Sequence, residues 1–522
     1  MSLRNLIVTM VIPLILCCLC ELIAASPSDN YDPGFEDLFM TNNKPYENIP
    51  IKFHHPLPKW LRGVLVRNGP GQMEMGTRKF LSYLDGYAKL HSWNFPGDGS
   101  AFYSSKMIKS KSYISSLEKK EMEACIMFEG PSPPFSAIER MKCMMRNMDN
   151  MNVNVFNYRN RTVAINDLWF AYEFELQTLN TIGSLTPPVP KSKFPSFGTI
   201  HSMSSAHPVP EYGTSARFEI ITALSLIPGM KHRLGVVRIT SLEATEMIAE
   251  WEIDEIRYMH SFSVTRNYVV LLAAPCRMNS QHLMMTCTVG SGMVWDDDGR
   301  TIIYVVEIKT GIVHILFTKS VFVVHHINAF ELPNGKIVMD LPTQKSSAGF
   351  ALFEMSFLLN DTARMDVGSM PTLKRYTLDL PTKSVSITTF ESGPKAPCAG
   401  ELEFPVINEN YRHSNYCFIY GLVYNYNRKG FSHFALVKKD VCNNEGDLMY
   451  AQPHHYFTEP WFVPKPGGND EDDGVLMTSA FDGNTKQSYL LMIDPKTMTV
   501  SNRANMPTTV PFNFHGRFFD MS

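Results

Sequence analysis

The sequence has almost no excess of either charge. Its 48 lysine and arginine residues nearly balance 51 aspartate and glutamate residues, for a formal net charge of −3. A basic stripe and an acidic tail are both absent, so nucleic acid is not a predicted partner. Long helical periodicity is absent too. Because 44% of the residues are hydrophobic and 19% are charged, we expect a globular chain with a large core, neither disordered nor fibrous.

Cysteine is too sparse to support the fold. Three of the ten cysteines lie in an apolar run at the N-terminus, and the other seven contain no Cys-x-x-Cys pair. This spacing excludes a disulfide scaffold and a zinc ribbon. Seven is an odd number, so at least one thiol stays unpaired. We expect mostly buried free cysteines, with no bridge or one.

The N-terminus resembles a secretory signal peptide. Arg4 precedes a mostly apolar run over residues 6–25, and a polar stretch follows it. This pattern predicts a signal peptide over residues 1–25 and a place in the secretory pathway, secreted or lumenal. The alternative is an uncleaved anchor, because a run of this length can span a bilayer. Pro13 and Glu21 interrupt the run and favour the signal peptide.

Residues 26–522 are predicted to form one all-β domain. Short β-branched and aromatic runs alternate with Gly, Pro, Asn and Asp from about residue 50 onward. Hairpin turns are predicted at residues 309–311, 334–335 and 494–497. Sequons at Asn160 and Asn360 agree with a lumenal location.

A weak internal repeat suggests how the strands are organised. Threonines in tight turns recur at Thr178, Thr310, Thr382 and Thr497, at intervals of one or two units of roughly 60 to 70 residues. About seven such units fit the chain, which favours a seven-bladed β-propeller with helical and loop insertions capping its top face.

Three segments interrupt this pattern, over residues 104–150, 224–233 and 278–295. The last two contain apolar patches flanked by cations. These patches agree with peripheral membrane contact or the mouth of an apolar tunnel, and equally with packing of methionine-rich loops.

Four histidines lie where an apolar run meets a polar turn: His207, His260, His325 and His515. Their separations are close to one, one and three repeat units. In a circular fold this spacing places them on inner strands that face a common axis, where they could bind one metal ion. Imidazole suits Fe, Zn, Cu and Ni alike, so the histidines alone do not select the metal.

Other histidines compete with these four. His326 adjoins His325, and strand alternation lets only one of the two face the axis. The remaining candidates are predicted to be structural or solvated: His91, His201, His314, His454 and His455.

Three acids stand in apolar surroundings: Asp167, Glu403 and Glu459. Metal-bound histidines usually donate their second ring N–H to a carboxylate or carbonyl, so each acid could orient one histidine. Taken singly, each also agrees with a capped turn or an ordinary half-buried acid.

A series of motifs runs through the chain in a familiar order. These are PKWLRGVLVRNGPG, LDGYAKLHSWNF, SAHP, YMHSF, VVHHINAFE, ELEFPVIN, TEPWFV, DEDDGVL and NFHG. The set resembles the carotenoid cleavage oxygenase family, in the animal branch that includes the carotene oxygenases and the retinal pigment epithelium isomerohydrolase. The resemblance extends from about residue 50 to the C-terminus.

The resemblance implies a seven-bladed propeller with Fe(II) on its axis. The implied iron ligands are His207, His260, His325 and His515, so the family pattern selects His325 over His326. Two of the family's supporting glutamates match Glu403 and Glu459.

The chain departs from the family at three places. The third glutamate falls on Asp167, which is one methylene shorter, and this puts a direct hydrogen bond to a ligand histidine in question. Ser82 and Leu84 replace a histidine and a phenylalanine. The stretch GPSPPFSAIERMKC over residues 130–143 lacks the family's Pro-Cys pair.

The implied activity is an Fe(II)-dependent dioxygenase that cleaves one C=C bond of a carotenoid or apocarotenoid with O2, giving aldehydes such as retinal. The motifs supply no nucleophile or general base, so no catalytic residue is predicted beyond the metal centre. One alternative is a retinyl ester isomerohydrolase that uses the same iron site. Another is a non-enzymatic secreted propeller that binds a lipid or carotenoid.

Overall fold

The computed structural model describes residues 32–123, 125, 127–144, 149–194, 198–227 and 229–521. The predicted signal peptide lies outside this part of the chain. Strands dominate what is described, which confirms the all-β prediction. The helices are short, and they are α2 (Lys111–Lys119), α3 (Ala137–Met144), α4 (Ser280–Thr286), α5 (Met355–Leu358) and α6 (Asp361–Met365).

Seven antiparallel sheets of four or five strands follow one another along the chain. The first contains β1 (Tyr46–Pro50), β2 (Gly63–Gln72), β5 (Tyr87–Phe95), β6 (Phe102–Met107) and β36 (His515–Asp520). The second contains β8 (Asn154–Tyr158), β9 (Arg161–Ile165), β10 (Ala171–Phe174) and β11 (Thr181–Leu185). The third contains β12 (Thr199–Met203), β13 (Val209–Pro210), β14 (Arg217–Ser225), β15 (His232–Ser241) and β16 (Ala244–Ile253).

The remaining four sheets continue this order. The fourth contains β17 (Ser263–Val264), β18 (Tyr268–Ala273), β21 (Thr301–Glu307) and β22 (Val313–Thr318). The fifth contains β23 (Asn328–Glu331), β24 (Ile337–Thr343), β25 (Thr372–Asp379) and β26 (Ser384–Thr389). The sixth contains β27 (Glu403–Val406), β28 (Phe418–Val423), β29 (Ala435–Asp440) and β30 (Leu448–Tyr450). The seventh contains β31 (His455–Phe457), β32 (Trp461–Pro464), β33 (Gly474–Asp482), β34 (Gln487–Asp494) and β35 (Thr499–Asn505).

Two smaller sheets lie outside this series. One contains β3 (Glu74–Met75), β4 (Arg78–Phe80) and β7 (Pro131–Ser132), and the other contains β19 (Cys276–Met278) and β20 (Met293–Trp295).

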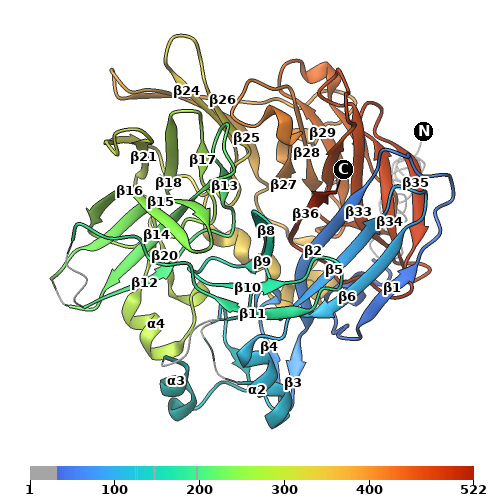
Figure 1. The fold of residues 1–522 in the computed structure, drawn as a ribbon, viewed down its shortest axis with the longest axis horizontal. Helices are drawn as coiled ribbons and strands as arrows, with labels where there is room; N and C mark the ends of the chain where they lie inside the picture. The colour runs from blue at the N-terminus through green and yellow to red at the C-terminus, as the bar shows by residue number, and fades with distance from the viewer. Residues whose placement is uncertain are drawn as a thin grey trace, which may run out of the picture.

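Each large sheet packs against the next, and the seventh packs against the first. Successive side chains of a strand point to opposite faces, so one strand can contribute to two cores. In β2, for example, Val64 and Val66 pack toward the second sheet while Leu65 packs toward the seventh. Residues of neighbouring sheets share one core cluster at each interface, for example Val66 and Ala164, Val163 and Ile221, Val236 and Val269, Ile303 and Met339, Val338 and Ile419, Leu422 and Leu491, and Leu490 and Leu65. Figure 1 shows the sheets succeeding one another around the middle of the molecule.

The two ends of the described chain meet in one sheet. The C-terminal strand β36 pairs antiparallel with β2, with Val66 opposite Arg517 and Asn68 opposite His515. In Figure 1 the red end of the chain therefore lies beside the blue start.

The repeated threonines mark equivalent positions, as the internal repeat predicts. Thr178, Thr310, Thr382 and Thr497 each lie in the hairpin between the last two strands of a sheet. In two of these turns the threonine hydroxyl donates to the glutamate three residues earlier, at 2.6 Å from Thr178 to Glu175 and 2.7 Å from Thr310 to Glu307. These turns belong to the second, fourth, fifth and seventh sheets.

Helices and loops fill the predicted insertions. Helices α2 and α3 lie within residues 104–150 and α4 lies within residues 278–295, and Figure 1 shows the three on the same side of the sheets. Helices α5 and α6, between β24 and β25, are not predicted by the sequence patterns. No helix among the described residues is long and apolar enough to cross a membrane.

One disulfide, Cys417–Cys442, joins the start of β28 to the loop after β29. The other described cysteines are free, and four of those five are buried, as the odd count predicts.

Candidate metal centre

Three of the four predicted histidines lie on loops. His207, His260 and His325 precede β13, β17 and β23, while His515 begins β36. The prediction that all four stand on inner strands is therefore wrong for three of them. A loop residue needs no ladder partner, so its ring can turn toward the axis without breaking a sheet hydrogen bond.

Serine hydroxyls tie these loops to one another. The Ser205 hydroxyl donates to the His260 carbonyl at 2.7 Å and accepts the His207 backbone N–H at 2.9 Å. One sheet further on, Ser261 donates to the carbonyl of Val324 at 2.6 Å. The His207 loop is thus tied to the His260 loop, and the His260 loop to the His325 loop.

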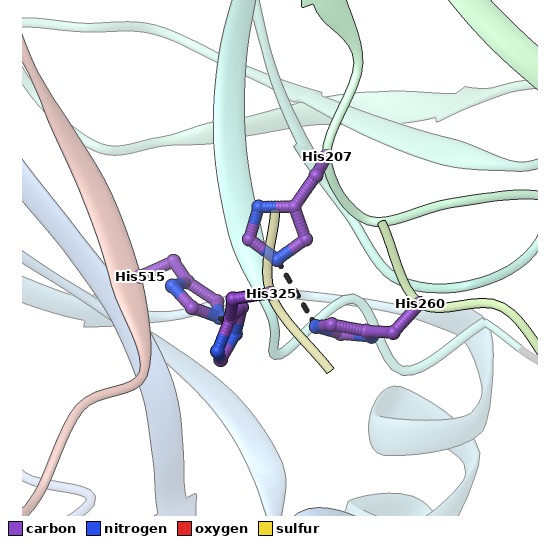
Figure 2. A group of neighbouring side chains, drawn as sticks. All are labelled: His207, His260, His325 and His515. Atoms are coloured by element: carbon purple, nitrogen blue, oxygen red, sulfur yellow. Dashed lines mark hydrogen bonds between the residues drawn. The ribbon is translucent and has the colours of Figure 1, made fainter. Parts of the chain in front are cut away.

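The four imidazole rings converge on one point (Figure 2). Their ligand atoms all lie within 4.8 Å of one another. The Nε2 atoms of His207 and His260 are 3.0 Å apart, and those of His325 and His515 are 3.2 Å apart. Two nitrogens that bind one ion at about 2.1 Å are separated by about 3.0 Å at right angles and about 3.4 Å at the tetrahedral angle. The donor set fits a divalent metal ion.

Three of the rings are oriented by the predicted carboxylates. The Nδ1 atoms of His260, His325 and His515 lie 2.9, 2.7 and 2.8 Å from carboxylate oxygens of Asp167, Glu403 and Glu459, respectively. A carboxylate accepts hydrogen bonds, so Nδ1 carries the proton and the lone pair on Nε2 is free to bind a metal.

Asp167 makes a direct hydrogen bond despite its shorter side chain. Its Oδ2 accepts from His260 at 2.9 Å and from the Tyr258 hydroxyl at 2.7 Å, while its Oδ1 accepts the Ala206 N–H at 2.9 Å. The bond is neither lost nor bridged by water. Sequence analysis missed Tyr258, although it lies two residues before His260, a spacing that places two side chains on one side of an extended backbone.

Arg67 supports Glu459 from behind. Its guanidinium donates to Glu459 Oε2 at 2.7 Å, and both side chains are buried. Burial raises the pKa of Glu459 to about 7, against the opposing effect of Arg67. Sequence analysis missed Arg67 too. The available signal was a charged residue inside the apolar run VLVRNG, because a buried arginine requires a partner.

His207 differs from the other three ligand candidates, because no carboxylate contacts it among the described residues. Burial, followed by the nearby rings of His515 and His260, holds the pKa of His207 well below its ordinary value. Burial and then His325 do the same for the pKa of His515. Both rings are therefore neutral at pH 7, as metal binding requires.

The competing histidines have other partners. His326 lies outside the cluster that contains His325, and its Nδ1 lies 2.8 Å from the Ser263 hydroxyl. His91 contacts the Tyr103 hydroxyl and His455 that of Tyr489, each at 2.7 Å. The side chain of His201 lies outside the described part.

An apolar cavity of about 230 Å³ opens beside the cluster. Three of the four rings line it: His260, His325 and His515. Its other walls are mainly aromatic, aliphatic and methionine side chains, with Phe350, Phe353, Phe404 and Phe514 among them. Such a cavity suits a long apolar ligand.

Phe404 holds an unusual backbone conformation at the edge of this cavity. Its φ is +52°, in the left-handed region that costs free energy for a residue with a side chain. The ring centroid lies 5.3 Å from those of both His325 and His515. The conformation places an aromatic wall beside the cluster directly after Glu403. No sequence pattern predicts it.

Two groups in this cavity that could act as a base or a nucleophile, Asp85 and Cys125, are protonated at pH 7. Burial raises the pKa of Asp85 to about 8, which leaves its carboxyl largely neutral at pH 7. Burial also raises the pKa of the Cys125 thiol far above its ordinary value. The chemistry of the site therefore depends on what the histidines bind.

A second cavity, of about 90 Å³, reaches the cluster from another direction. His207, His325 and His515 line it. The other side chains around it are mixed, with serine, asparagine, glutamate and arginine beside phenylalanine, proline, valine and tryptophan, and we call it the polar cavity after its charged groups.

Family and structural comparisons agree with this geometry. The family model described as retinal pigment epithelial membrane protein matches residues 41–520. The mitochondrial carotenoid-cleaving dioxygenase of Pongo abelii is 27% identical, with 93% of this chain and 94% of that protein covered. The β,β-carotene 15,15′-dioxygenase of Mus musculus is 26% identical, with 92% and 91% covered.

The fold matches that of solved structures of the Synechocystis apocarotenoid oxygenase. A glutamate-to-aspartate variant superimposes with a TM-score of 0.79 at 20% identity, covering 94% of this chain and 98% of that one. The cobalt-substituted enzyme gives a TM-score of 0.79 at 21% identity, with the same coverage.

Proposed function

The chain belongs to the retinal pigment epithelial membrane protein family, the group of carotenoid oxygenases that its motifs predict, and from this premise we propose that it is an Fe(II)-dependent dioxygenase. The reaction splits one C=C bond of a carotenoid or apocarotenoid into two carbonyl products, aldehydes such as retinal. The observation that carries the proposal is the exposure of His260, His325 and His515 to an apolar cavity. A polyene offers little for polar groups to hold, so an apolar wall beside a metal centre suits it.

For the architecture we infer a closed seven-bladed β-propeller formed by one domain over residues 26–522. The packing of each large sheet against the next supports the inference, as does the contact between the seventh and the first. Strand β36 adds the end of the chain to the first sheet. The four histidines then surround the axis.

The ligands of the proposed iron are His207, His260, His325 and His515. When bound there, iron(II) supplies the activation of dioxygen that oxidative cleavage requires. The protein does the rest. Its carboxylates keep the ligand nitrogens deprotonated, and the phenylalanine walls exclude water and align the polyene beside the cluster.

The decisive experiment is incubation of the iron-loaded protein with a panel of carotenoids under ¹⁸O₂. We expect aldehyde products that carry label from dioxygen, identified by chromatography and mass spectrometry. Label from water on a retinol product formed from a retinyl ester would favour the isomerohydrolase. Intact polyenes with iron bound would count against cleavage, and no iron after anaerobic reconstitution would favour the non-enzymatic binding protein.

Membrane contact of the helical side forms part of the proposal. The apolar side chains Ile138 and Met141 of α3 and Met285 of α4 are 64%, 62% and 73% exposed, and Leu283 of α4 lines the apolar cavity. Exposed apolar patches of this kind suit a lipid surface from which a carotenoid or retinoid could enter. Together with the predicted signal peptide, this supports a membrane-associated protein of the secretory pathway. Flotation with lipid vesicles, repeated with Met285→Ser, tests the contact.

A further inference from the structure

The polar cavity beside the histidines contains a charge imbalance that the proposed oxygenase chemistry does not use. Arg412, Arg517 and Glu409 line it, and Arg217 lies close enough to interact electrostatically with both Glu409 and Arg517. Three guanidinium groups thus face one carboxylate. Glu459, which also lines the cavity, is occupied by Arg67.

Glu409 is fully committed to one of these arginines. Arg412 donates to its two carboxylate oxygens at 2.7 and 2.6 Å, in a bidentate pair. Burial alone would raise the pKa of Glu409, but the neighbouring arginines outweigh burial and lower it to about 2. Because the acid is ionised and paired with Arg412, the charges of Arg217 and Arg517 stay uncompensated.

The planar guanidinium group of Arg517 stacks on aromatic rings, and its in-plane N–H groups are not all hydrogen-bonded. Its guanidinium carbon lies 4.5 Å from the ring centroid of Phe156 and 5.6 Å from that of Trp461. Its Nε is buried and has no hydrogen-bond partner among the described residues. A stacked guanidinium keeps its N–H groups available in its own plane, the arrangement that binds planar oxyanions.

Arg217 repeats this pattern nearby. The residue is 9% exposed, and its guanidinium carbon lies 5.1 Å from the same Phe156 ring. Two of its nitrogens donate to the carbonyl and side chain of Asn157, at 3.3 and 3.2 Å. The third, Nη1, is buried without a partner in the described structure.

Two neighbouring cations, each with a buried donor atom that has no partner, are costly unless a counter-ion joins them. We propose that the polar cavity binds a small planar oxyanion, a carboxylate or bicarbonate, between Arg517 and the neighbouring arginines. The cavity volume of about 90 Å³ admits an anion of this size and no fatty acid.

The test is thermal denaturation of the iron-loaded full-length protein with increasing sodium acetate or bicarbonate, against sodium chloride at equal ionic strength. We expect acetate or bicarbonate to raise the Tm by a few degrees, in a saturable manner. The more effective anion identifies the ligand class. An equal response to all three salts would overturn the proposal and leave water as the occupant.

Three variants test whether the response comes from this cavity. Arg517→Gln should abolish it, whereas Arg277→Gln, the same change at an exposed arginine, should preserve it. Glu409→Gln removes the competing acid and should increase the response. An undiminished response in Arg517→Gln would contradict the proposal. So would loss of the wild-type response after iron removal, because the anion would then be binding the metal. Neither result depends on cleavage activity.

Discussion

The two cavities that meet at the histidines differ in almost every property except the rings they share. One is apolar and of about 230 Å³, whereas the other is polar and of about 90 Å³. His325 and His515 line both, His260 lines only the apolar cavity, and His207 only the polar one. The difference teaches that the four histidines lie between two chemically distinct cavities. His325 and His515 contribute to the walls of both cavities, one suited to a large apolar ligand and the other to small polar species.

The largest expected effect comes from removing one of the histidines that separate the two cavities. His325→Ala should remove iron from the protein and reduce cleavage by more than about 100-fold. This exceeds the loss of about 10- to 100-fold that follows substitution of a residue hydrogen-bonded to a metal ligand. His326→Ala, one residue away but facing only the polar cavity, should keep iron and activity. Iron content by elemental analysis and product formation by chromatography measure both. Equal iron loss in the two variants would show that the histidine assignment is wrong.

The second effect tests the carboxylate that orients one of these histidines. Glu403→Gln replaces the acceptor that lies 2.7 Å from His325 Nδ1 and should lower iron affinity or kcat by about 10- to 100-fold. Gln344→Ala is the matched control, since Gln344 only donates to the other Glu403 oxygen at 3.2 Å and should cost much less. Metal titration under anaerobic conditions gives the affinities. If both variants bind iron as the wild type does, the carboxylate does not orient the ring.

A third, smaller effect should be confined to the apolar side. Phe514→Ala removes a ring from the cavity wall and should raise KM for a carotenoid by about tenfold, with iron content unchanged. The altered wall should also change which double bond is cleaved. Steady-state kinetics with product identification separates this from a folding defect, because lost iron would accompany misfolding. An unchanged KM and product would place the substrate elsewhere.

The smallest effect is expected on the polar side. Ser263→Ala removes the hydroxyl that lies 2.8 Å from His326 Nδ1, and it should change kcat/KM for the carotenoid by no more than about twofold. A tenfold loss would mean that the polar cavity contributes to cleavage, and the contrast between the two sides would fail.

Much of this arrangement could be predicted from the sequence, because repeated sheets place equivalent residues at regular intervals along the chain. The threonine turns place their sheets at intervals of two, one and two, and the histidines follow the same repeat unit at intervals of one, one and three. The choice of His325 over His326 needed the family motif. Strand alternation excludes one of two neighbours without saying which.

Other features depend on contacts between distant segments, which spacing does not encode. The apolar setting of Asp167 marks it as a candidate, yet its reach to His260 depends on Tyr258 and on the loop that carries Ala206. The positive φ of Phe404 likewise follows from the packing around it. Three histidines were expected on strands because the apolar runs around them look like strands. In the fold the next strand begins only two or three residues after each of these histidines.

Because β36 pairs with β2, the cluster is completed only by a strand that is synthesised late. His515 follows His325 by 190 residues, so three of the clustered histidines emerge from the ribosome long before the fourth, which β36 carries. A chain shortened by a late stop codon would retain nearly all of its sheets and still lack the ligand that completes the cluster. Loss of β36 would therefore remove one of the four clustered rings while most of the sheets still form, and a measurement of protein abundance alone would not reveal the defect.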